Sequence, residues 1–185
     1  LRQHKLRNRQ FFLFVSSIEP RKNIGRLLDA YESLEPGFRR KYPLVLTGSS
    51  GWKSEEITAR IRKMKDTGEV RYLGYTSDTE LACLYSAAGA LVFPSVYEGF
   101  GLPIIEAQAM SVPVITSNVS CMPEVAGGAA LLVDPHDTGS ISGALGRIML
   151  DGELRESLKA QGLKNASQYS WEQTVTKTVD VYSRL

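Results

Sequence analysis

Residues 90–116 read ALVFPSVYEGFGLPIIEAQAMSVPVIT, and this stretch holds a strand, a loop, a helix and a second strand in succession. The apolar runs at 90–93 and 112–116 have the length and composition of strands that are buried on both faces. Between them, Pro103 suits the first turn of a helix, because the N–H that proline lacks would have no intrahelical partner there. Strand, helix and strand in this order predict one unit of an α/β fold with a parallel sheet.

The same alternation continues on both sides of this stretch. Continuous apolar runs predict further strands at 11–16, 43–47, 70–73 and 130–134. Apolar residues at helical spacing follow each of these runs, and Asn23 is expected to cap the first of the helices. We therefore predict a Rossmann-like, doubly wound parallel sheet of about six strands, with helices on both faces.

Turns that are rich in glycine or charge follow four of the predicted strands, at 17–22, 48–52, 74–75 and 95–102. Ligands of open α/β sheets bind beyond the carboxyl ends of the strands. Because parallel strands all end at the same edge, we expect these four turns to lie together and to form the functional site.

The turn before the helix at Pro103 predicts an anion site. Backbone N–H groups near residues 100–104 are expected to point out of the helix N-terminus, where a phosphate is stabilised. Glu98 precedes this helix start and Glu106 lies within the helix, while Arg21 and Lys22 follow the first strand. Donors for a diphosphate, with acids for hydroxyl groups on either side, suit a nucleotide-sugar.

Composition narrows the class of protein. The 185 residues allow one large domain or a compact pair, and no apolar run approaches the roughly 18 residues of a membrane span. Cys83 and Cys121 are too few for a disulfide framework, so we expect buried, reduced thiols and a cytoplasmic protein.

The positive charge is concentrated at the start of the chain. Residues 1–10 contain four basic residues and no acid, whereas the rest of the chain is slightly acidic, so a nucleic-acid partner is not expected. We interpret residues 1–10 as a solvated basic linker or N-terminal extension. Contact of this segment with anionic lipid or with a partner remains the alternative.

Several common catalytic motifs are missing from the sequence. The first predicted strand is not followed by G-x-G-x-x-G, and there is no P-loop and no H-E-x-x-H. No D-x-D occurs, and His4 and His136 are the only histidines, so we expect no metal site. By elimination, the anion is expected to be held by backbone N–H groups together with Arg21 and Lys22.

A family resemblance is visible in these motifs. The pattern E-G-F-G-L-P-x-x-E at 98–106, followed by A-x-x-x-x-V-P-V-I at 107–115, resembles the E-x7-E signature of retaining glycosyltransferases of family 4. The words P-R-K-N, L-G-Y-T, F-P-S and M-P-E-V also occur in that family's order, at 20–23, 73–76, 93–95 and 122–125.

The resemblance implies one half of a GT-B fold, which has two Rossmann-like domains with a cleft between them. Residues 11–185 are then expected to be the C-terminal, donor-binding domain, and the N-terminal acceptor domain is expected to lie outside this chain. An isolated half should bind the donor but transfer poorly or not at all. The apolar stripe of the last predicted helix, from Trp171 to Tyr182, is expected to pack against the domain that is not present.

The resemblance also implies roles for individual residues. Lys22 would pair with the donor diphosphate, whereas Ser17 stands where the family usually has an arginine, which makes Arg21 the candidate to compensate. Glu98 would lie near the donor hexose as a positioning group, and Glu106 would accept hydrogen bonds from the ribose hydroxyls. The remaining donor-binding residues would be Gly48 and Tyr75 at the base, and the N–H groups of Phe100, Gly101 and Leu102 at the phosphate and sugar. Gly48 and Tyr75 could instead serve turn geometry and core packing alone.

The function expected from this resemblance is transfer of a hexose with retention and without a metal or cofactor. The donor would be a GDP-sugar or UDP-sugar, with mannose favoured, and the acceptor a glycan or lipid-linked glycan at the inner face of the cytoplasmic membrane. Two alternatives stay open, a GT-B-like sugar-nucleotide epimerase and a non-catalytic module that binds nucleotide-sugars.

Overall fold

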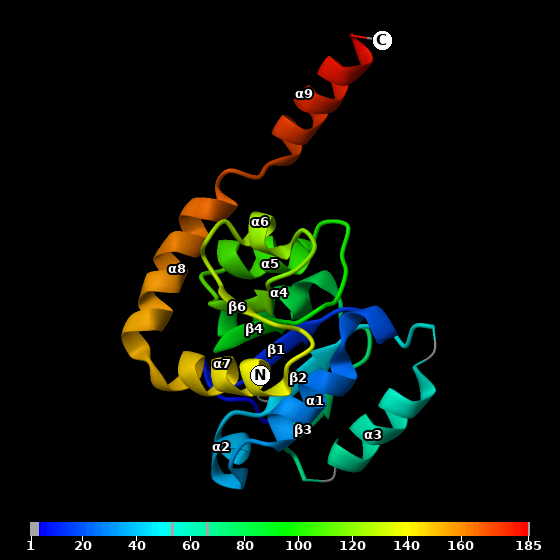
Figure 1. The fold of residues 1–185 in the computed structure, drawn as a ribbon, viewed down its shortest axis with the longest axis vertical. Coiled ribbons are helices and arrows are strands. Elements are labelled where there is room, and N and C mark those ends of the chain that lie inside the picture. Colours follow the sequence, from blue (N-terminus) through cyan, green and yellow to red (C-terminus); the bar gives the residue numbers. More distant parts are fainter. Residues whose placement is uncertain (1–3, 53, 66, 185) are drawn as a thin grey trace.

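The computed structural model describes residues 4–52, 54–65 and 67–184, and a parallel sheet forms its centre (Figure 1). The strand order is β3-β2-β1-β4-β5-β6, and every neighbouring pair is parallel. The strands are β1 (Phe12–Val15), β2 (Leu44–Thr47), β3 (Val70–Tyr72), β4 (Ala90–Phe93), β5 (Val114–Ser117) and β6 (Leu131–Val133). The predicted six-stranded Rossmann-like sheet is confirmed.

Helices connect the strands and continue beyond the last one. They are the short 3-10 helix η2 (Pro20–Lys22), α1 (Ile24–Glu32), α2 (Pro36–Lys41), α3 (Glu55–Lys65), α4 (Asp78–Ala87), α5 (Leu102–Ala109), α6 (Met122–Ala126), α7 (Thr138–Leu150), α8 (Gly152–Ala166) and α9 (Trp171–Tyr182). Within the described ranges, no helix is both long and apolar enough to cross a membrane.

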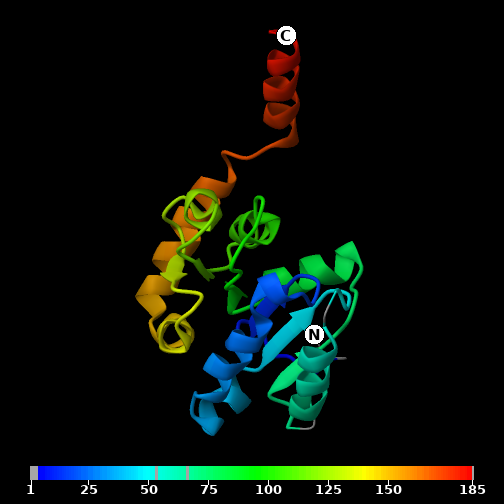
Figure 2. The ribbon, with the colours of Figure 1, turned by 45° about the vertical axis from the view of Figure 1, so that its right-hand side comes forward.

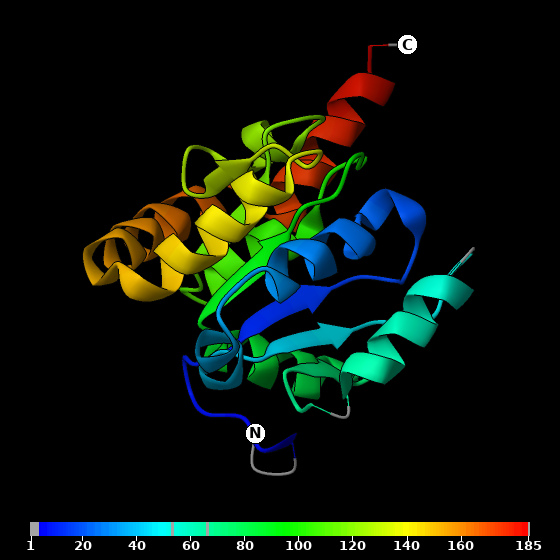
Figure 3. The ribbon, with the colours of Figure 1, turned by 60° about the horizontal axis from the view of Figure 1, so that its bottom comes forward.

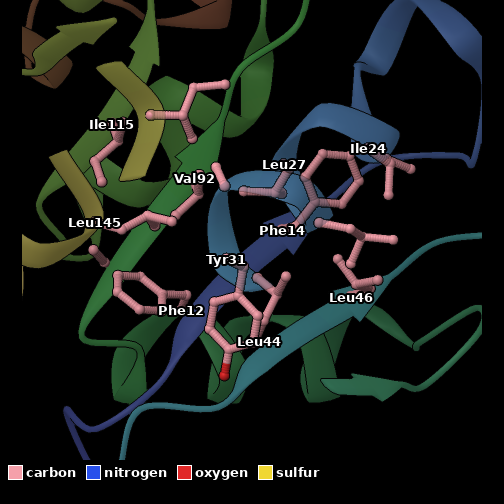
Figure 4. Close-up of a cluster of buried hydrophobic side chains, with 14 of the residues drawn as sticks. Phe12, Phe14, Ile24, Leu27, Tyr31, Leu44, Leu46, Val92, Ile115 and Leu145 are labelled. Carbon is pink, nitrogen blue, oxygen red and sulfur yellow. The ribbon is translucent and has the colours of Figure 1, made fainter. Parts of the chain in front are cut away.

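Two apolar clusters lie on the two faces of the sheet, because successive strand residues point to opposite faces. Phe12 and Phe14 face α1 and α7 in one cluster, which Figure 4 shows together with Tyr31 of α1 and Leu145 of α7. Leu13 faces the other side, where α4, α5 and α6 supply the covering residues. Figure 3 shows α1 lying over β1 and β2. Burial on both faces explains why the strands are continuous apolar runs.

The strand order places a topological switch point between β1 and β4. From β1 the chain continues outward to β2 and β3, and after β3 it crosses back to β4 and then continues in the other direction. The loops that leave the carboxyl ends of β1 and β4 therefore diverge, and a crevice of this kind is the usual ligand site of doubly wound sheets.

Three local expectations need correction. Asn23 precedes α1 but adopts a left-handed conformation, and its side chain donates to the carbonyl oxygens of Pro94 and Pro135 instead of capping the helix. Cys83 is exposed and Cys121 is partly exposed, so the expected burial of both thiols is wrong. Cys83 lies on the solvent-exposed side of α4, whereas the next two residues, Leu84 and Tyr85, are buried.

The N-terminal segment packs against the domain from residue 4 onward. Leu6 is buried in the same cluster as α4 and α5. The Arg9 guanidinium donates to the carbonyl oxygens of Ala88 and Ser111 at 3.1 and 3.4 Å. The interpretation of this segment as a solvated linker is therefore wrong for residues 4–10, because an apolar side chain and a hydrogen-bonded arginine fix it to the body.

A buried polar network fastens α8 to α5 and to the end of α6. The Asn165 amide donates to Gln108 Oε1 and to the Val125 carbonyl oxygen, both at 2.8 Å. The Gln108 amide in turn donates to the Ala126 carbonyl oxygen at 3.0 Å. A Cβ on Gly162 would lie 3.0 Å from Gln108 Cγ, so glycine permits the close approach of the two helices.

Beyond this network, α9 leaves the body of the domain, as Figures 1 and 2 show. Its residues are exposed along the whole helix, and the apolar ones are no exception: Trp171, Val175, Val179, Val181 and Tyr182 are 54–74% exposed. The apolar stripe seen in the sequence therefore exists on the helix, and nothing in the described part of the chain covers it.

Candidate functional site

The turns that follow β1, β2, β3 and β4 are joined to one another by backbone hydrogen bonds. Ile18 and Ser50 form an isolated parallel bridge between the first two turns. The Gly48 N–H donates to the Gly74 carbonyl oxygen at 2.8 Å, and the Val96 N–H donates to the Arg21 carbonyl oxygen, also at 2.8 Å. The expectation that four turns meet at one edge of the sheet is thus confirmed.

Gly48 allows the first two turns to approach each other closely. Its φ is +133°, and a Cβ added to it would lie 2.0 Å from the Ser16 carbonyl oxygen. No other residue type fits this position without movement of the backbone. Gly74, in the next turn, also has a positive φ of 70°, but a Cβ there would meet nothing within 4 Å.

The centre of the site is a cluster of two cations and one acid, Lys22, Arg21 and Glu98. Lys22 Nζ donates to Glu98 Oε1 at 2.6 Å, and an Arg21 guanidinium nitrogen donates to Glu98 Oε2 at 2.6 Å. Lys22 and Glu98 are only 6% and 8% exposed, and a buried charge is tolerated when it is paired in this way. Lys22 Nζ also lies 5.3 Å from the centre of the Phe93 ring. The sequence placed these three groups in one site but did not predict that Glu98 binds both cations.

A second acid, Glu19, holds the other side of Arg21. The Ser17 hydroxyl donates to Glu19 Oε1 at 2.6 Å, and Arg21 Nε donates to Glu19 Oε2 at 3.1 Å. The hydrogen bond from Ser17 and the charge of Arg21 lower the pKa of the Glu19 carboxyl. Ser17 thus acts on Arg21 through Glu19, a residue that was not predicted to belong to the site. The sequence pattern that could have indicated this role of Glu19 is the alternation of Ser17, Glu19 and Arg21 within one short turn.

The turn between β5 and α6 supports the loop that bears Glu98. The Ser120 hydroxyl donates to the Glu98 carbonyl oxygen at 3.0 Å, and Cys121 Sγ donates to the Phe100 carbonyl oxygen at 3.2 Å. Ser120 adopts a φ of 56°, which is uncommon for a residue other than glycine. Ser120 and Cys121 directly precede the M-P-E-V motif at 122–125, and they were not predicted as site residues.

The N-terminus of α5 follows directly after this loop. Gly101 precedes the helix with a φ of 95°, and Leu102 is its first residue. Pro103 has no N–H, and the Ile104 N–H donates to the Gly101 carbonyl oxygen at 2.9 Å, so the expectation of free donors up to residue 104 needs correction. Among the first three residues of α5, Leu102 is the one whose N–H is left for an anion. One turn further on, the exposed Glu106 accepts a 2.8 Å hydrogen bond from the Tyr85 hydroxyl of α4.

Exposure excludes the predicted alternative of core packing for Tyr75, and the same holds for Trp52 in a neighbouring turn. Tyr75 is 81% exposed and Trp52 is 72% exposed, so neither ring covers the core. Both stand at the carboxyl edge, in the turns after β3 and β2. Across residues 4–52, 54–65 and 67–184, no three His, Cys, Asp or Glu side chains are grouped so that they could hold a metal ion.

The site therefore has two parts. Ser17, Arg21, Lys22 and Glu98 belong to one hydrogen-bonded cluster at the switch point, with Glu19 as its added member. Glu106 belongs to the second part, on α5. Phe100, Gly101 and Leu102 connect the two along the chain, and Gly48 and Tyr75 stand in the neighbouring turns.

Comparison with known proteins shows which family has this architecture. Residues 2–165 match the family model described as Glycosyl transferases group 1. The chain belongs to this family. This match agrees with the family resemblance seen in residues 98–115.

Individual relatives agree with this assignment. The chain is 43% identical to O-antigen chain mannosyltransferase B of Escherichia coli over 185 residues, covering 100% of this chain and 49% of that relative. It resembles the sucrose-phosphate synthase structure from Thermosynechococcus elongatus with a TM-score of 0.81 and 29% identity, over 94% of this chain and 45% of the other. HepE of Anabaena, solved in complex with UDP-glucose, has the same fold with a TM-score of 0.82 at 19% identity, over 95% and 49% of the two chains. The chain thus spans about half the length of these relatives.

Proposed function

We propose that this group 1 domain is the donor-binding half of a glycosyltransferase that transfers a hexose, with mannose favoured, from a nucleoside diphosphate sugar. The acceptor is a glycan or lipid-linked glycan, the anomeric configuration is retained, and neither a metal nor a cofactor takes part. The main support is the cluster of Lys22, Arg21 and Glu98 beside the N-terminus of α5, at the switch point of the sheet. The 43% identity to a mannosyltransferase favours mannose.

The reaction separates a diphosphate from the sugar, so negative charge develops on the phosphate oxygens. Fixed positive groups aimed at those oxygens stabilise this transition state. Lys22, Arg21 and the Leu102 N–H at the start of α5 supply that charge in the proposed function. Because Lys22 and Arg21 also bind Glu98, the diphosphate and Glu98 share the same two cations.

Glu98 positions the donor hexose in this proposal and does not act as a nucleophile. Each of its two carboxylate oxygens already accepts a hydrogen bond from a cationic nitrogen at 2.6 Å, so neither oxygen is a free nucleophile. The carboxylate can accept hydrogen bonds from sugar hydroxyls while the cations hold it in place. The nucleoside lies toward Gly48 and Tyr75 with its ribose at Glu106.

We infer that the exposed apolar stripe of α9 is the surface on which the other half of the protein docks. The chain spans only 49% of its mannosyltransferase relative, so a partner domain of similar size is expected. A groove of about 540 Å³ continues from this stripe to α5, between Phe100, Leu102, Tyr169 and Trp171, and it reaches Glu106. Packing of the second half on this surface would bring the acceptor domain to the donor site.

We place the reaction in the cytoplasm, at the inner face of the membrane where a lipid-linked acceptor is accessible. Lys5 and Arg7 are exposed on the packed N-terminal segment and can attract anionic lipid headgroups. A cosedimentation assay with vesicles that contain anionic lipid tests this contact.

The proposed function is tested first by calorimetric titration of the complete protein with GDP, UDP and ADP. We expect one of the three to bind, and Glu106→Ala to weaken that binding about 10- to 100-fold, because hydrogen bonds from hydroxyls to a carboxylate are lost. Glu124→Ala, which removes an exposed acid of α6, is the matched control and should bind as the wild type does. Absence of binding by all three nucleotides would contradict the proposal.

Product analysis separates the two alternatives from the proposed function. An epimerase would convert the nucleotide-sugar into its epimer without an acceptor, and a non-catalytic module would bind the nucleotide-sugar without turnover. Transfer of labelled hexose to a glycan acceptor by the complete protein is the result that we expect.

Substitutions on α9 test the assignment of its surface. We expect Trp171→Ser combined with Val175→Ser to leave the melting temperature of this domain nearly unchanged, because both side chains are already exposed. In the complete protein the same pair should reduce transferase activity by about tenfold or more, because an aromatic anchor of a domain interface is lost. Lys177→Ser on the same helix is the control, and equal activity of the two variants would rule out this role for the stripe.

A further inference from the structure

Tyr85 is a buried phenol that contacts the site without belonging to the cluster around Glu98. It lies on α4 and is only 2% exposed, yet its hydroxyl donates to Glu106 Oε2 at 2.8 Å. Burial, reinforced by the charge of Glu106, raises the pKa of Tyr85 well above its usual value. The phenol therefore remains a hydrogen-bond donor throughout the physiological pH range.

The surroundings of Tyr85 fix the direction of this hydrogen bond. Its ring is part of the apolar cluster that α4 and α5 share with one face of the sheet, together with Leu84, Leu91 and Ala107. A ring packed in this way cannot follow a moving carboxylate. Glu106, in contrast, is on the solvent-exposed side of α5, where an acid without a fixed partner would sample several rotamers.

We propose that Tyr85 is a positioning residue that orients Glu106 toward the ribose hydroxyls of the donor nucleotide. The inference rests on the proposed function and adds to it the group that makes the domain selective for ribonucleotides. Because the phenol occupies Oε2, Glu106 keeps Oε1 for the ligand, and the carboxylate does not have to be immobilised when the nucleotide binds. A buried phenol needs some acceptor in any case, and the selectivity test below distinguishes positioning from that purely structural role.

The experiment compares the nucleoside diphosphate that binds the wild-type protein with its 2′,3′-dideoxy counterpart. The wild type should prefer the ribonucleotide. In Tyr85→Phe, which removes only the hydroxyl, we expect the affinity for the ribonucleotide to fall about five- to tenfold while the affinity for the dideoxy compound stays the same. The preference should shrink by that same factor.

Two further variants separate a loss of ribonucleotide preference from a loss of protein stability. Glu106→Asp shortens the acid, breaks its contact with Tyr85 from the exposed side and keeps the charge, so it should also lose the preference. Tyr31→Phe is the control, because the hydroxyl of Tyr31 lies within 3.1 Å of the carbonyl oxygens of Arg39, Tyr42 and Glu69 and belongs to the core of the opposite face. It should lower the melting temperature and leave the preference intact.

The outcomes separate this inference from the proposed function. If Tyr85→Phe keeps the full wild-type preference while Glu106→Ala loses it, the role of Tyr85 is overturned and the role of Glu106 stands. If the wild type binds no nucleoside diphosphate, the proposed function itself is overturned, and the inference falls with it.

Discussion

Replacing Glu98 with alanine is expected to lower the free energy of unfolding by about 3 kcal/mol. The substitution leaves the Lys22 ammonium, which is 6% exposed, without the carboxylate that lies 2.6 Å from it. An unpaired buried charge costs more than the pair itself contributes, because the desolvation of the remaining ion is no longer compensated. Urea unfolding of the wild type and the variant measures the difference.

A double variant separates the charge effect from other effects of the substitution. Lys22→Met combined with Glu98→Ala removes both buried charges, so it should be more stable than Glu98→Ala alone. Glu98→Ala should also retain its affinity for the nucleoside diphosphate, because both cations become free for the phosphates. A single variant as stable as the wild type would show that the ion pair is not a structural requirement of this site.

Gly48→Ala should lower the free energy of unfolding by about 2–3 kcal/mol, because the substitution strains the backbone. Its Cβ would lie 2.0 Å from the Ser16 carbonyl oxygen, and no side-chain rotation can relieve a contact between a Cβ and a backbone oxygen. The turn after β1 must therefore move, and Arg21 and Lys22 move with it. We expect nucleotide affinity to fall together with the midpoint of thermal unfolding.

Gly74→Ala is the matched substitution at the neighbouring turn. Gly74 also has a positive φ, but a Cβ there meets no atom within 4 Å, so only the conformational cost of about 1 kcal/mol applies. Similar losses in the two variants would mean that positive φ, and not the close approach to Ser16, determines the need for glycine at position 48.

The fold was predictable because its four central strands, β2, β1, β4 and β5, are buried on both faces. Every strand lies within two residues of the predicted run, and the parallel order follows from the alternation of strands with helices. The caps at Ser77, Asp137 and Ser170 depend on residues that are near in sequence, and the structure has a capping hydrogen bond at each of them. Local patterns therefore contained most of the information about the architecture.

The contacts within the site were not predictable in the same way. Glu98 meets its two cations across more than seventy residues, and Asn23 reaches Pro135 across more than one hundred. Such pairs depend on which turns the sheet brings together, and sequence spacing does not report that. The packing of Leu6 was missed for a related reason, since a single apolar residue among basic ones has no periodic pattern.

The attachment of α8 has a mechanical consequence for the helix that bears Glu106. The Asn165–Gln108 hydrogen bond and the edge-to-face contact of Tyr169 with Phe100, at 5.7 Å between ring centres, tie the base of α9 to both ends of the stretch 100–108. If α9 is the docking surface that we propose, a movement of α9 would reach the helix that bears Glu106 through these two contacts. In the proposed function, docking of a second domain on α9 and the hold of Glu106 on the donor ribose would then be coupled.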